Sequence, residues 1–426
     1  MPLPEVLEIV PLQGLPRAEI CVPGSKSLTN RALILAALGE GRCVLEGALW
    51  SEDTQVMVDC LSRLGWKVSV EPDREEAANC CISLEGLGGR VPPGGTHDQP
   101  LELFVGNAGT AARFLTALVC LGEGWYRISG VPRMHERPQA ELFAALRSLG
   151  YRIESPNDRL PALILGSGPL PGKCRVSIEK SSQFASALLM CACVGGWEVE
   201  VVGANADEAP YVEMTRGLMA AFAQAGGRIV IEPDASSGSY FWAVNALWGV
   251  TGPDWAVRVR HWPDSGWQVD ARFPNLLPLQ RPLSRATDLG DSIMTAIVLA
   301  PFARHPLSFV DLGRLRVQEC ERVLALRTEL TKCGARVREK GDTLEFVPGP
   351  LHGAEIETYD DHRMAMCFAL LGLKVPGIRL LKPGCVKKSF PNFFQKLALP
   401  PPEGLGAELR DGRSGRILPP AELTAE

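Results

Sequence analysis

Long hydrophobic runs and an excess of positive charge are both missing from this sequence. No apolar stretch approaches about 18 residues without a charge or a turn signal, so we expect no membrane-spanning helix. The 44 Lys and Arg residues are outnumbered by 49 Asp and Glu residues, and the net charge of -5 gives no general attraction to nucleic acids or acidic membranes. Any anion site must therefore be built from cations that gather locally.

Metal-binding and secretory patterns are also lacking. The six histidines form no H-E-x-x-H pattern and the thirteen cysteines form no C-x-x-C pairs with zinc spacing, so we predict no metal site. The N-terminus MPLPEVLEIV has no basic region followed by an apolar one, which argues against a secretory signal. We therefore expect a cytoplasmic protein whose cysteines are reduced.

The chain length favours more than one domain. A chain of 426 residues exceeds what a single hydrophobic core usually supports, so we expect two domains. Hydrophobic residues at 46% and charged residues at 22% are typical of an ordinary globular protein. The segment 399–426 has no core-forming pattern, and we predict a mobile C-terminal tail.

The stretch VPGSKSLTNRALILAAL, residues 22–38, places small polar residues and a lysine directly before an apolar helix. A nucleotide-binding P-loop needs adjacent Gly and Lys with a second glycine five residues upstream. Here Ser25 separates Gly24 from Lys26, and Glu19 stands upstream, so the P-loop is excluded. What remains is a helix N-terminus, whose unpaired N–H groups and dipole favour an anion. An ordinary helix cap with a surface lysine is the alternative.

Similar polar clusters precede small-residue apolar helices five more times, at intervals of 53 to 80 residues. They are VGNAGTAARFLTALVCL from Val105, EKSSQFASALLMCACV from Glu179, DASSGSYFWAVNALW from Asp234, LGDSIMTAIVLAPFA from Leu289 and YDDHRMAMCFALLGL from Tyr359. Helices that are rich in Ala, Leu, Met and Cys on all faces are buried helices. Second helices follow in four places and end in a glycine, namely MVDCLSRLGWKV, ELFAALRSLGYRI, GLMAAFAQAGGRI and LRTELTKCGARV.

These repeats predict an α/β fold of six repeated units with buried helices and outer sheets. The fourth unit, around residues 255–285, shows no clear second helix. Three units in each domain would place residues 1–21 and 234–398 in the first domain and residues 22–233 in the second. Cations lie near the predicted element starts, where a cation opposes the helix dipole unless an anion compensates. They are Lys26, Arg31, Arg113, Arg322, Arg363 and Lys388.

Over residues 8–398 the chain resembles the 5-enolpyruvylshikimate-3-phosphate synthase family of enolpyruvyl transferases. The motifs that carry the resemblance, in the family's order and spacing, are GSKSLTNRA, GNAGTAARF, PRMHERP, SSQFASALL, DASSGSYF, GDSIMTA, RVQECER and YDDHRMAM. The resemblance implies transfer of the enolpyruvyl group of phosphoenolpyruvate to the 5-hydroxyl of shikimate 3-phosphate, in the shikimate pathway of aromatic amino acid biosynthesis. It implies that the six units form a two-domain inside-out α/β barrel, with no metal or organic cofactor and with domain closure around the two substrates.

The resemblance also implies two sets of binding residues. The phosphoenolpyruvate set would be Lys26, Gly109, Arg137, Gln183, Arg322, Arg363 and Lys388. The shikimate 3-phosphate set would be Ser27, Arg31, Ser181, Ser182, Gln183, Tyr211, Asp291 and Gln318. Arginines suit the first set because a guanidinium fork can hold a carboxylate or a phosphate with two parallel hydrogen bonds.

Proton transfer would fall to Asp291 and Glu319, together with Lys26 and Lys388 as catalytic lysines. One group must take the proton of the attacking hydroxyl and another must protonate the enol carbon. We assign the first role to Asp291 and the second to Glu319 or Lys388. The residues alone also allow other interpretations: Asp291 could cap a helix, Glu319 and Arg322 could be a solvated helical ion pair, and His362 could be structural.

The chain departs from the family pattern at four positions. Gln318 stands where a lysine is usual, Arg314 where an asparagine is common, and Glu208 about where a serine is usual. A carboxylate at Glu208 would repel the substrate phosphate unless it points away. Phe114 stands where many members have proline, and we expect altered sensitivity to glyphosate, which the inhibition constant of Phe114→Pro would test.

Two other functions stay open at this point. One is the enolpyruvyl transferase that acts on UDP-N-acetylglucosamine, whose reactive cysteine loop is absent because the corresponding region reads PRMHERP. The other is a non-catalytic anion-binding paralogue, suggested by Gln318 and Glu208. The retained acid, base and cations favour the shikimate enzyme. Its partners would be small molecules, with no nucleic acid and no membrane, and we expect a monomer whose domains close on ligand binding.

Overall fold

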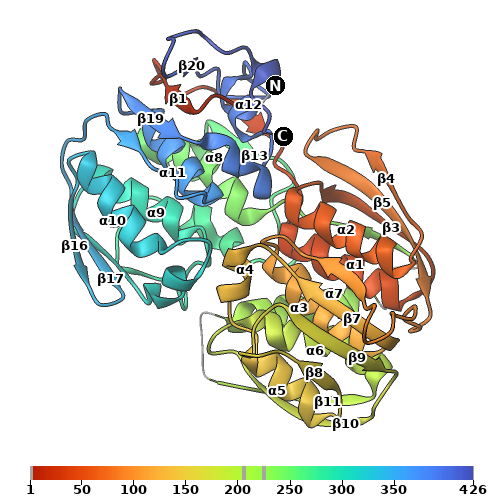
Figure 1. Cartoon of the computed structure of the whole chain (residues 1–426). Coiled ribbons are helices and arrows are strands. Elements are labelled where there is room, and N and C mark those ends of the chain that lie inside the picture. Colours follow the sequence, from red (N-terminus) through yellow and green to blue (C-terminus); the bar gives the residue numbers. More distant parts are fainter. Residues whose placement is uncertain (1–2, 204–207, 223–226, 426) are drawn as a thin grey trace. The chain divides into compact units, whose positions relative to one another are not determined.

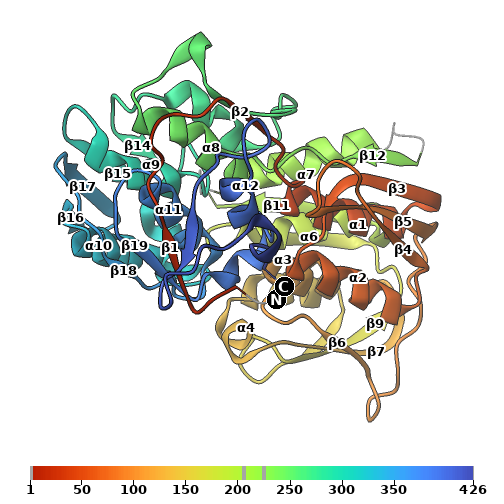
Figure 2. The same cartoon turned by 90° about the horizontal axis from the view of Figure 1, so that it is seen from above.

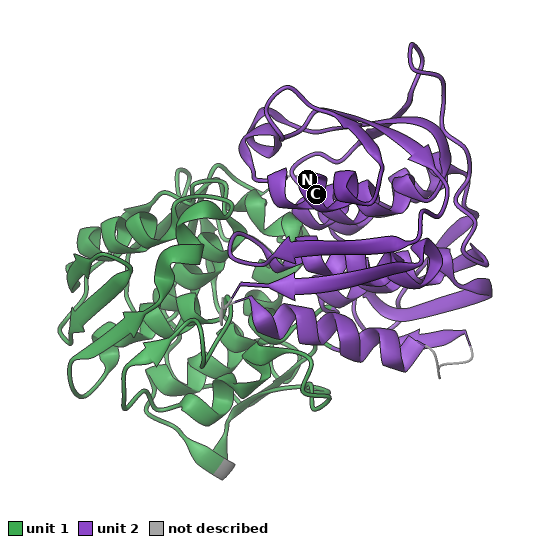
Figure 3. Ribbon diagram, turned by 90° about the horizontal axis from the view of Figure 1, so that it is seen from below, with its two compact units in different colours: residues 1–23, 233–426 green, residues 24–232 purple. Residues whose placement is uncertain are grey.

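The computed structural model describes residues 3–203, 208–222 and 227–425. The chain divides into two compact units, which Figure 3 shows in different colours. Unit 1 contains residues 1–23 and 233–426, and unit 2 contains residues 24–232. The unit boundaries lie within two residues of the boundaries expected at residues 22 and 233.

Unit 2 contains three sheets and seven α-helices among its described residues. The sheets have the strand orders β12-β3-β5-β4, β6-β7-β9-β8 and β10-β11. The strands are β3 (Glu40–Leu49), β4 (Val68–Pro72), β5 (Asn79–Leu87), β6 (Leu101–Phe104), β7 (Glu123–Ser129), β8 (Arg152–Glu154), β9 (Ala162–Ser167), β10 (Gly172–Ser177), β11 (Trp197–Val202) and β12 (Arg228–Val230). The helices are α1 (Lys26–Leu38), α2 (Glu52–Leu64), α3 (Gly109–Cys120), α4 (Pro132–Glu136), α5 (Ala140–Ser148), α6 (Ser182–Gly195) and α7 (Ala209–Phe222).

The small-residue helices of unit 2 are buried, as their composition predicts. All twelve residues of α3 and ten of the 13 residues of α1 are buried. Helix α1 packs against β3 and β5, which lie beside it in Figure 2. Small side chains on every face allow a helix to contact neighbours all round, so these helices form the interior of the unit.

The amphipathic second helices end where the sequence predicts. Helix α2 is followed by Gly65 with a φ of +108°, and α10 (Arg322–Lys332) is followed two residues later by Gly334 with a φ of +87°. Left-handed backbone at a helix end strongly favours glycine, because other residues have a Cβ that clashes there. The end of GLMAAFAQAGGRI falls on residues 223–226, which lie outside the described residues.

Unit 1 is discontinuous in sequence, and its described residues contain three sheets. The strand orders are β18-β19-β1-β20, β14-β15-β17-β16 and β13-β2. The strands are β1 (Val6–Ile9), β2 (Ala18–Ile20), β13 (Val257–Val259), β14 (Leu283–Ser284), β15 (Leu307–Val310), β16 (Arg336–Lys340), β17 (Thr343–Val347), β18 (Glu355–Ile356), β19 (Ile378–Leu381) and β20 (Leu409–Asp411). The other helices are α8 (Ala235–Leu247), α9 (Ile293–Leu299), α11 (His362–Gly372) and α12 (Phe393–Ala398), with the 3₁₀ helices η1 (Gly252–Asp254), η2 (Val269–Leu276), η3 (Ala300–Phe302), η4 (Leu312–Val317), η5 (Pro383–Lys388) and η6 (Pro420–Glu422).

Helices α8, α9 and α11 pack on one another inside unit 1. Every residue of α9 and of α11 is buried. Strands β16 and β17 form an edge of the unit beside α10, as Figure 1 shows. The mixed α/β content predicted from the sequence is therefore confirmed.

The region around residues 255–285 lacks a second α-helix. It contains the 3₁₀ helix η2, and Pro274 lies inside this helix. Proline has no backbone N–H and its ring clashes with the preceding turn, so an α-helix cannot continue through it. The sequence therefore shows no helical pattern here because there is no α-helix to predict.

The prediction of a mobile C-terminal tail is wrong. Strand β20 pairs antiparallel with β1, so the segment after residue 398 completes a sheet of unit 1. The segment also buries the side chains of Leu405, Leu409, Leu418 and Leu423. These leucines are separated by turns instead of recurring with a helical or strand period, and so the sequence pattern did not reveal them.

Leu409→Ala is expected to lower the free energy of unfolding by about 2–5 kcal/mol, because it removes a fully buried side chain and leaves a cavity. Ile417→Ala is the matched control in the same segment, since Ile417 is 56% exposed and should change stability by only about 0.5 kcal/mol. Urea unfolding of both variants measures the difference. An effect of Leu409→Ala as small as that expected for Ile417→Ala would show that burial of Leu409 does not stabilise unit 1.

No helix in the described part of the chain is long and apolar enough to cross a membrane. All thirteen cysteines fall within the described residues, and none of them forms a disulfide bond. Burial and the neighbouring Asp361 carboxylate raise the pKa of the Cys320 thiol, which keeps this thiol protonated and slow to react. The cytoplasmic location and the monomeric state stay predictions.

Candidate active site

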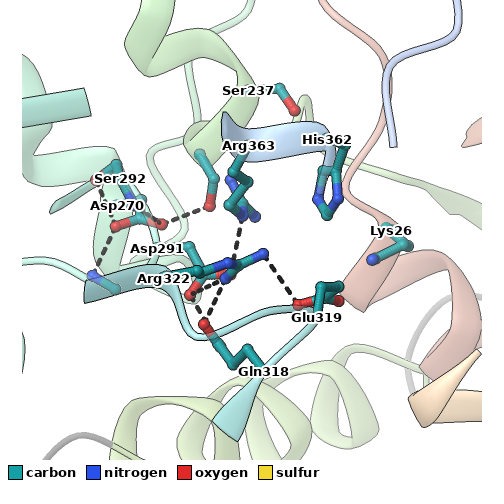
Figure 4. A network of polar contacts seen from close by, with 12 residues as sticks. Lys26, Ser237, Asp270, Asp291, Ser292, Gln318, Glu319, Arg322, His362 and Arg363 are labelled. Atoms are coloured by element: carbon teal, nitrogen blue, oxygen red, sulfur yellow. Dashed lines mark hydrogen bonds and ion pairs between the residues drawn. The ribbon is translucent and has the colours of Figure 1, made fainter. Parts of the chain in front are cut away.

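The centre of a buried polar network in unit 1 is Arg322, the first residue of α10 (Figure 4). Its side chain is 1% exposed, and its Nε donates to Asp361 Oδ2 at 2.7 Å. Nη2 lies 3.2 Å from Asp361 Oδ1 and 2.9 Å from Glu319 Oε2, and Nη1 donates to Gln318 Oε1. Burial lowers the pKa of Arg322, but the carboxylates of Asp361, Glu319 and Asp291 more than offset burial and raise it. Arg322 is therefore a permanent cation that holds several carboxylates together.

Asp291 lies among three arginines. Its Oδ2 is 3.1 Å from Arg363 Nε, and its Oδ1 is 3.4 Å from Arg285 Nη2 and 3.8 Å from Arg322 Nη1. Gln318 Nε2 also donates to Oδ1, at 3.3 Å. Burial raises the pKa of Asp291, but the three guanidinium groups outweigh burial and hold the pKa well below its ordinary value. Asp291 is therefore ionised at neutral pH.

A second carboxylate, that of Asp270, holds the turn that carries Asp291. Asp270 accepts hydrogen bonds from Gly290 N at 2.7 Å, from Ser292 Oγ at 2.6 Å and from Ser236 Oγ at 2.5 Å. Helix α9 begins after this turn, with Ser292 as the N-cap, so the interpretation of Asp291 as a helix cap is wrong. Burial raises the pKa of Asp270. The contacts of Asp270 to Gly290 and Ser292 fix the backbone on both sides of Asp291.

Glu319 connects the network to Lys388. Its Oε1 lies 3.9 Å from Lys388 Nζ, and Lys388 ends η5 with 8% exposure. The interpretation of Glu319 and Arg322 as a solvated helical pair is wrong, because α10 begins only at Arg322 and the Glu319 side chain is 13% exposed. A pair at this depth is strongly coupled, and the loss of one partner leaves the other charge buried.

A strained turn positions Asp361 and Arg363. Tyr359 and Asp360 both have left-handed backbone, with φ of +56° and +51°. The Tyr359 hydroxyl donates to Glu329 Oε1 at 2.7 Å, which holds the turn against α10. Asp361 is the N-cap of α11 and accepts from Arg363 N at 2.9 Å. Each left-handed non-glycine residue costs on the order of 1–3 kcal/mol, and such strain persists where the surroundings enforce a functional geometry. His362 is buried beside this cap.

In unit 2, two arginines meet at the N-terminus of α3. Arg137 Nη1 donates to the Asn107 carbonyl at 3.1 Å, and Arg113 Nη1 donates to the Gly109 carbonyl at 3.1 Å. A Cβ at Gly109 would lie 2.6 Å from Arg137 Nη2 and 2.8 Å from Arg113 Nη1, so a larger residue here would displace the two guanidinium groups from these positions. Lys26, the first residue of α1, lies 3.1 Å from Asp53 Oδ2.

Arg31 is buried in unit 2 and is held by four hydrogen bonds. It donates to the Thr215 hydroxyl at 2.7 Å, the Ser27 carbonyl at 2.9 Å, the Ser186 hydroxyl at 3.1 Å and the Tyr211 carbonyl at 3.4 Å. Its guanidinium carbon also lies 5.4 Å from the centre of the Phe114 ring. Burial lowers the pKa of Arg31 to about 10, which leaves it charged at neutral pH. Four of the five N–H groups of Arg31 already donate hydrogen bonds within the protein. Arg31 would therefore act on a bound anion mainly through its positive charge.

The N-terminus of α6 carries the remaining predicted residues. Ser181 is the N-cap and its Oγ accepts from Gln183 N at 3.3 Å. The Ser182 amide donates to Glu208 Oε2 at 2.7 Å. Glu208 is only 4% exposed, so its carboxylate lies inside unit 2 instead of pointing into solvent.

Comparison with known proteins identifies the family. The sequence model of the EPSP synthase family, whose members are 3-phosphoshikimate 1-carboxyvinyltransferases, matches residues 13–273 and 284–397 of this chain. The chain belongs to the EPSP synthase family. The resemblance seen in the sequence motifs is thereby confirmed.

Several relatives share the length of the chain. The 3-phosphoshikimate 1-carboxyvinyltransferase of Nostoc punctiforme is 37% identical, over 92% of this chain and 98% of the relative. That of Bordetella pertussis is 39% identical, over 91% and 97%. Among solved structures, EPSP synthase from Acinetobacter baumannii has a TM-score of 0.69 with 19% identity, over 95% of this chain and 99% of that chain. The enolpyruvyl transferase NikO from Streptomyces tendae has a TM-score of 0.66 with 16% identity, over 98% and 100%. These two structures share the fold.

The predicted site residues of this EPSP synthase family member fall into groups. One connected network in unit 1 contains Asp291, Gln318, Glu319, Arg322, Arg363 and Lys388. Unit 2 contains Lys26, Ser27, Arg31, Gly109, Arg137, Ser181, Ser182, Gln183 and Tyr211. Two residues that depart from the family pattern also lie in unit 1. Arg314 lies in η4. Gln318 bridges Asp291 and Arg322, because its amide Nε2 donates to Asp291 and its Oε1 accepts from Arg322. A lysine could donate to Asp291 but has no acceptor for Arg322.

Sequence reasoning missed three charged residues of this network. Asp270 and Arg285 lie in the irregular stretch before α9, where no helical or strand period marks buried positions. Asp361 is a fully buried carboxylate within the motif YDDHRMAM, directly before the helix that contains Arg363. Its place at a helix start beside predicted cations could have identified it.

Proposed function

We propose that this chain transfers the enolpyruvyl group of phosphoenolpyruvate to the 5-hydroxyl of shikimate 3-phosphate and releases phosphate. Family membership and the shared activity in the names of full-length relatives support this proposal. The observation that carries the proposal is the buried network in which Asp291 and Glu319 lie at the two terminal nitrogens of Arg322. Two carboxylates held by one cation suit a reaction that needs two separate proton transfers.

The donor phosphoenolpyruvate carries a phosphate and a carboxylate, which are held by cations. We assign Arg322, Arg363 and Lys388 of unit 1 to this task. Lys26, Gly109, Arg137 and Gln183 of unit 2 complete the set. In the structure, Arg322 contacts Gln318 and Glu319. When phosphoenolpyruvate binds, Arg322 would exchange these contacts for contacts to the substrate. Guanidinium groups fit both anions because their planar fork matches two oxygens at once.

The addition step forms a bond between the acceptor hydroxyl oxygen and C2 of phosphoenolpyruvate. Asp291 accepts the hydroxyl proton, and Glu319 or Lys388 delivers a proton to C3, which becomes a methyl group. Elimination then breaks the bond between C2 and the phosphate oxygen. The methyl group returns one proton to the group that protonated C3, the carbon–carbon double bond is restored, and phosphate leaves with the electron pair of the broken bond. Acceptor and donor thus yield the enolpyruvyl ether and phosphate.

Donor binding would also change the basicity of Asp291. The guanidinium groups of Arg363, Arg322 and Arg285 hold its pKa low. A bound phosphate and carboxylate would offset the charges of Arg322 and Arg363, so the pKa of Asp291 would rise. A base that strengthens when the donor arrives is suited to act only in the ternary complex.

We also propose the finer architecture, a barrel of six repeated units with buried helices and outer sheets. The small-residue helices α1, α3, α6, α8, α9 and α11 support it, because most of their residues are buried. Several polar residues of the two units lie at or just before the N-termini of these helices. Lys26, Gly109 and Ser182 are first helical residues, and Asp361 is an N-cap.

Phosphate release from phosphoenolpyruvate tests the function directly. We expect release with shikimate 3-phosphate as acceptor, and no release with UDP-N-acetylglucosamine or without an acceptor. Release with the sugar nucleotide alone would assign the chain to the other acceptor. Absence of release with both acceptors would contradict the proposal and would favour an anion-binding role.

A further inference from the structure

The first backbone amides of α6 are already occupied by side chains of the protein. A helix leaves its first N–H groups without partners inside the helix, and they attract anions. Here Ser181 Oγ accepts from Gln183 N, and the Glu208 carboxylate accepts from Ser182 N at 2.7 Å. Helix α6 has 14 residues, so its N-terminus has a well-developed positive end. Glu208 thus takes the place of an external anion.

The surroundings of Glu208 stabilise a buried negative charge. Glu208 is 4% exposed and Arg31 is 1% exposed, and electrostatic attraction from Glu208 opposes the effect of burial on the pKa of Arg31. The backbone joins the two side chains, because Tyr211 N donates to the Glu208 carbonyl while the Tyr211 carbonyl accepts from Arg31. A carboxylate and a guanidinium buried in one cluster compensate each other, as buried charges must.

We infer that Glu208 is a specificity-determining residue of the acceptor site, an internal anion that a phosphorylated acceptor must displace. This inference rests on the proposed function, which assigns Ser181, Ser182 and Arg31 to the acceptor phosphate. A phosphate cannot accept from the Ser182 amide while the Glu208 carboxylate does so. Two negative charges within about 4 Å repel strongly in a partly buried site, so the carboxylate must move away when the phosphate binds.

The consequence is a weakened preference for the phosphate group. Binding of a phosphorylated acceptor includes the cost of breaking the bond between Glu208 and Ser182 and of moving a buried carboxylate. An acceptor without a phosphate does not carry that cost. Glu208 therefore reduces the affinity for shikimate 3-phosphate relative to unphosphorylated shikimate, and leaves phosphoenolpyruvate binding unchanged.

Two variants of Glu208 separate charge from hydrogen bonding. Glu208→Ser removes the carboxylate and frees the Ser182 amide, whereas Glu208→Gln removes only the charge and keeps an oxygen that can accept from Ser182. We expect Glu208→Ser to bind shikimate 3-phosphate at least tenfold more tightly, and Glu208→Gln to show a smaller gain. Discrimination against shikimate should increase by the same factors. Glu213→Ser is the matched control on α7, because the Glu213 side chain is 66% exposed and pairs with Arg216 at the surface.

Isothermal calorimetry with shikimate 3-phosphate, shikimate and inorganic phosphate, each without the donor, measures these affinities. Unchanged or weaker shikimate 3-phosphate binding in both folded variants would overturn the inference, whether or not the wild type turns over. If Glu208→Ser fails to fold, Glu208→Gln decides the question. If the wild type releases no phosphate but the Glu208 variants bind shikimate 3-phosphate more tightly, only the proposed function is overturned. If the wild type turns over but the variants bind shikimate 3-phosphate no more tightly, only the role of Glu208 is overturned.

Discussion

Asp291→Asn is expected to lower turnover by about 10²–10⁴-fold, the usual contribution of a positioned proton acceptor, while shikimate 3-phosphate binding changes only a few-fold. Asparagine has nearly the same shape and keeps an oxygen that can accept from Gln318 and Arg285. It cannot take the hydroxyl proton. Phosphate release measures turnover, and calorimetry measures acceptor binding in the same preparation.

Asp288→Asn is the matched control for this variant. Asp288 lies three residues away in sequence, pairs with Arg281 at 2.6 Å and belongs to no proposed proton path. Turnover should remain close to that of the wild type. Near-normal turnover in Asp291→Asn would remove Asp291 from the proton-transfer step, and a large loss in Asp288→Asn would indicate that any change in this loop disrupts the site.

The depressed pKa of Asp291 also fixes the sign of a pH effect on stability. A carboxyl group whose folded pKa lies below its unfolded pKa stabilises the folded state fully above about pH 4, and this contribution is lost as the pH falls. The difference in unfolding free energy between the wild type and Asp291→Asn should therefore narrow when the pH is lowered from neutrality toward about 3.

Arg322→Met is expected to lower the free energy of unfolding by about 3–5 kcal/mol and to abolish donor binding. Methionine fills part of the same space but provides no charge. Asp361, which is 0% exposed, would lose its two hydrogen bonds from Arg322, and Glu319 and Asp291 would lose a shared counter-charge. The loss of stability is expected to be large because a buried carboxylate without a counter-charge destabilises the folded state. This holds even if the intact ion pair itself contributes little net stability.

Arg327→Met on the same helix is the control. The Arg327 side chain is 42% exposed and pairs with Glu339 at 3.0 Å, an interaction that contributes at most about 1 kcal/mol. Urea unfolding and phosphoenolpyruvate titration would compare the two variants. Equal loss of stability in both variants would contradict the central place of Arg322, as would retained donor binding in Arg322→Met.

The parts of the molecule that sequence reasoning predicts are those with a repeating pattern. The buried helices follow from their composition, and residues such as Lys26 and Ser182 are placed at helix starts by the polar clusters before them. Asp291 and Arg322 could be proposed as site residues from their motifs. The contacts that Asp291 and Arg322 make in the folded protein could not be predicted, because the same sequence spacing also fits a helix cap at Asp291 or a solvated ion pair between Glu319 and Arg322.

The missing parts depend on contacts between residues far apart in sequence. Asp270 meets Ser236, which lies 34 residues earlier in the chain, and Asp361 meets Arg322, which lies 39 residues earlier. Glu208 could be suspected as a charge in the wrong place, yet its bond to the Ser182 amide requires two elements to fold together. Local sequence patterns carry no information about contacts between residues so far apart. The burial and pairing of these charged side chains can therefore be seen only in the folded structure.

The position of β1 has a consequence for how the protein is made. Val6–Ile9 pairs with Ile378–Leu381 on one edge and with Leu409–Asp411 on the other. At a synthesis rate of about 5–20 residues per second, this strand leaves the ribosome roughly 20–70 seconds before its first partner exists. Unit 2 is continuous from residue 24 to residue 232 and is complete long before that moment. Strand β1 is therefore translated before unit 2 but can pair only after unit 2 is complete, and a nascent chain must keep this apolar strand from other partners until residues 378–411 have been made.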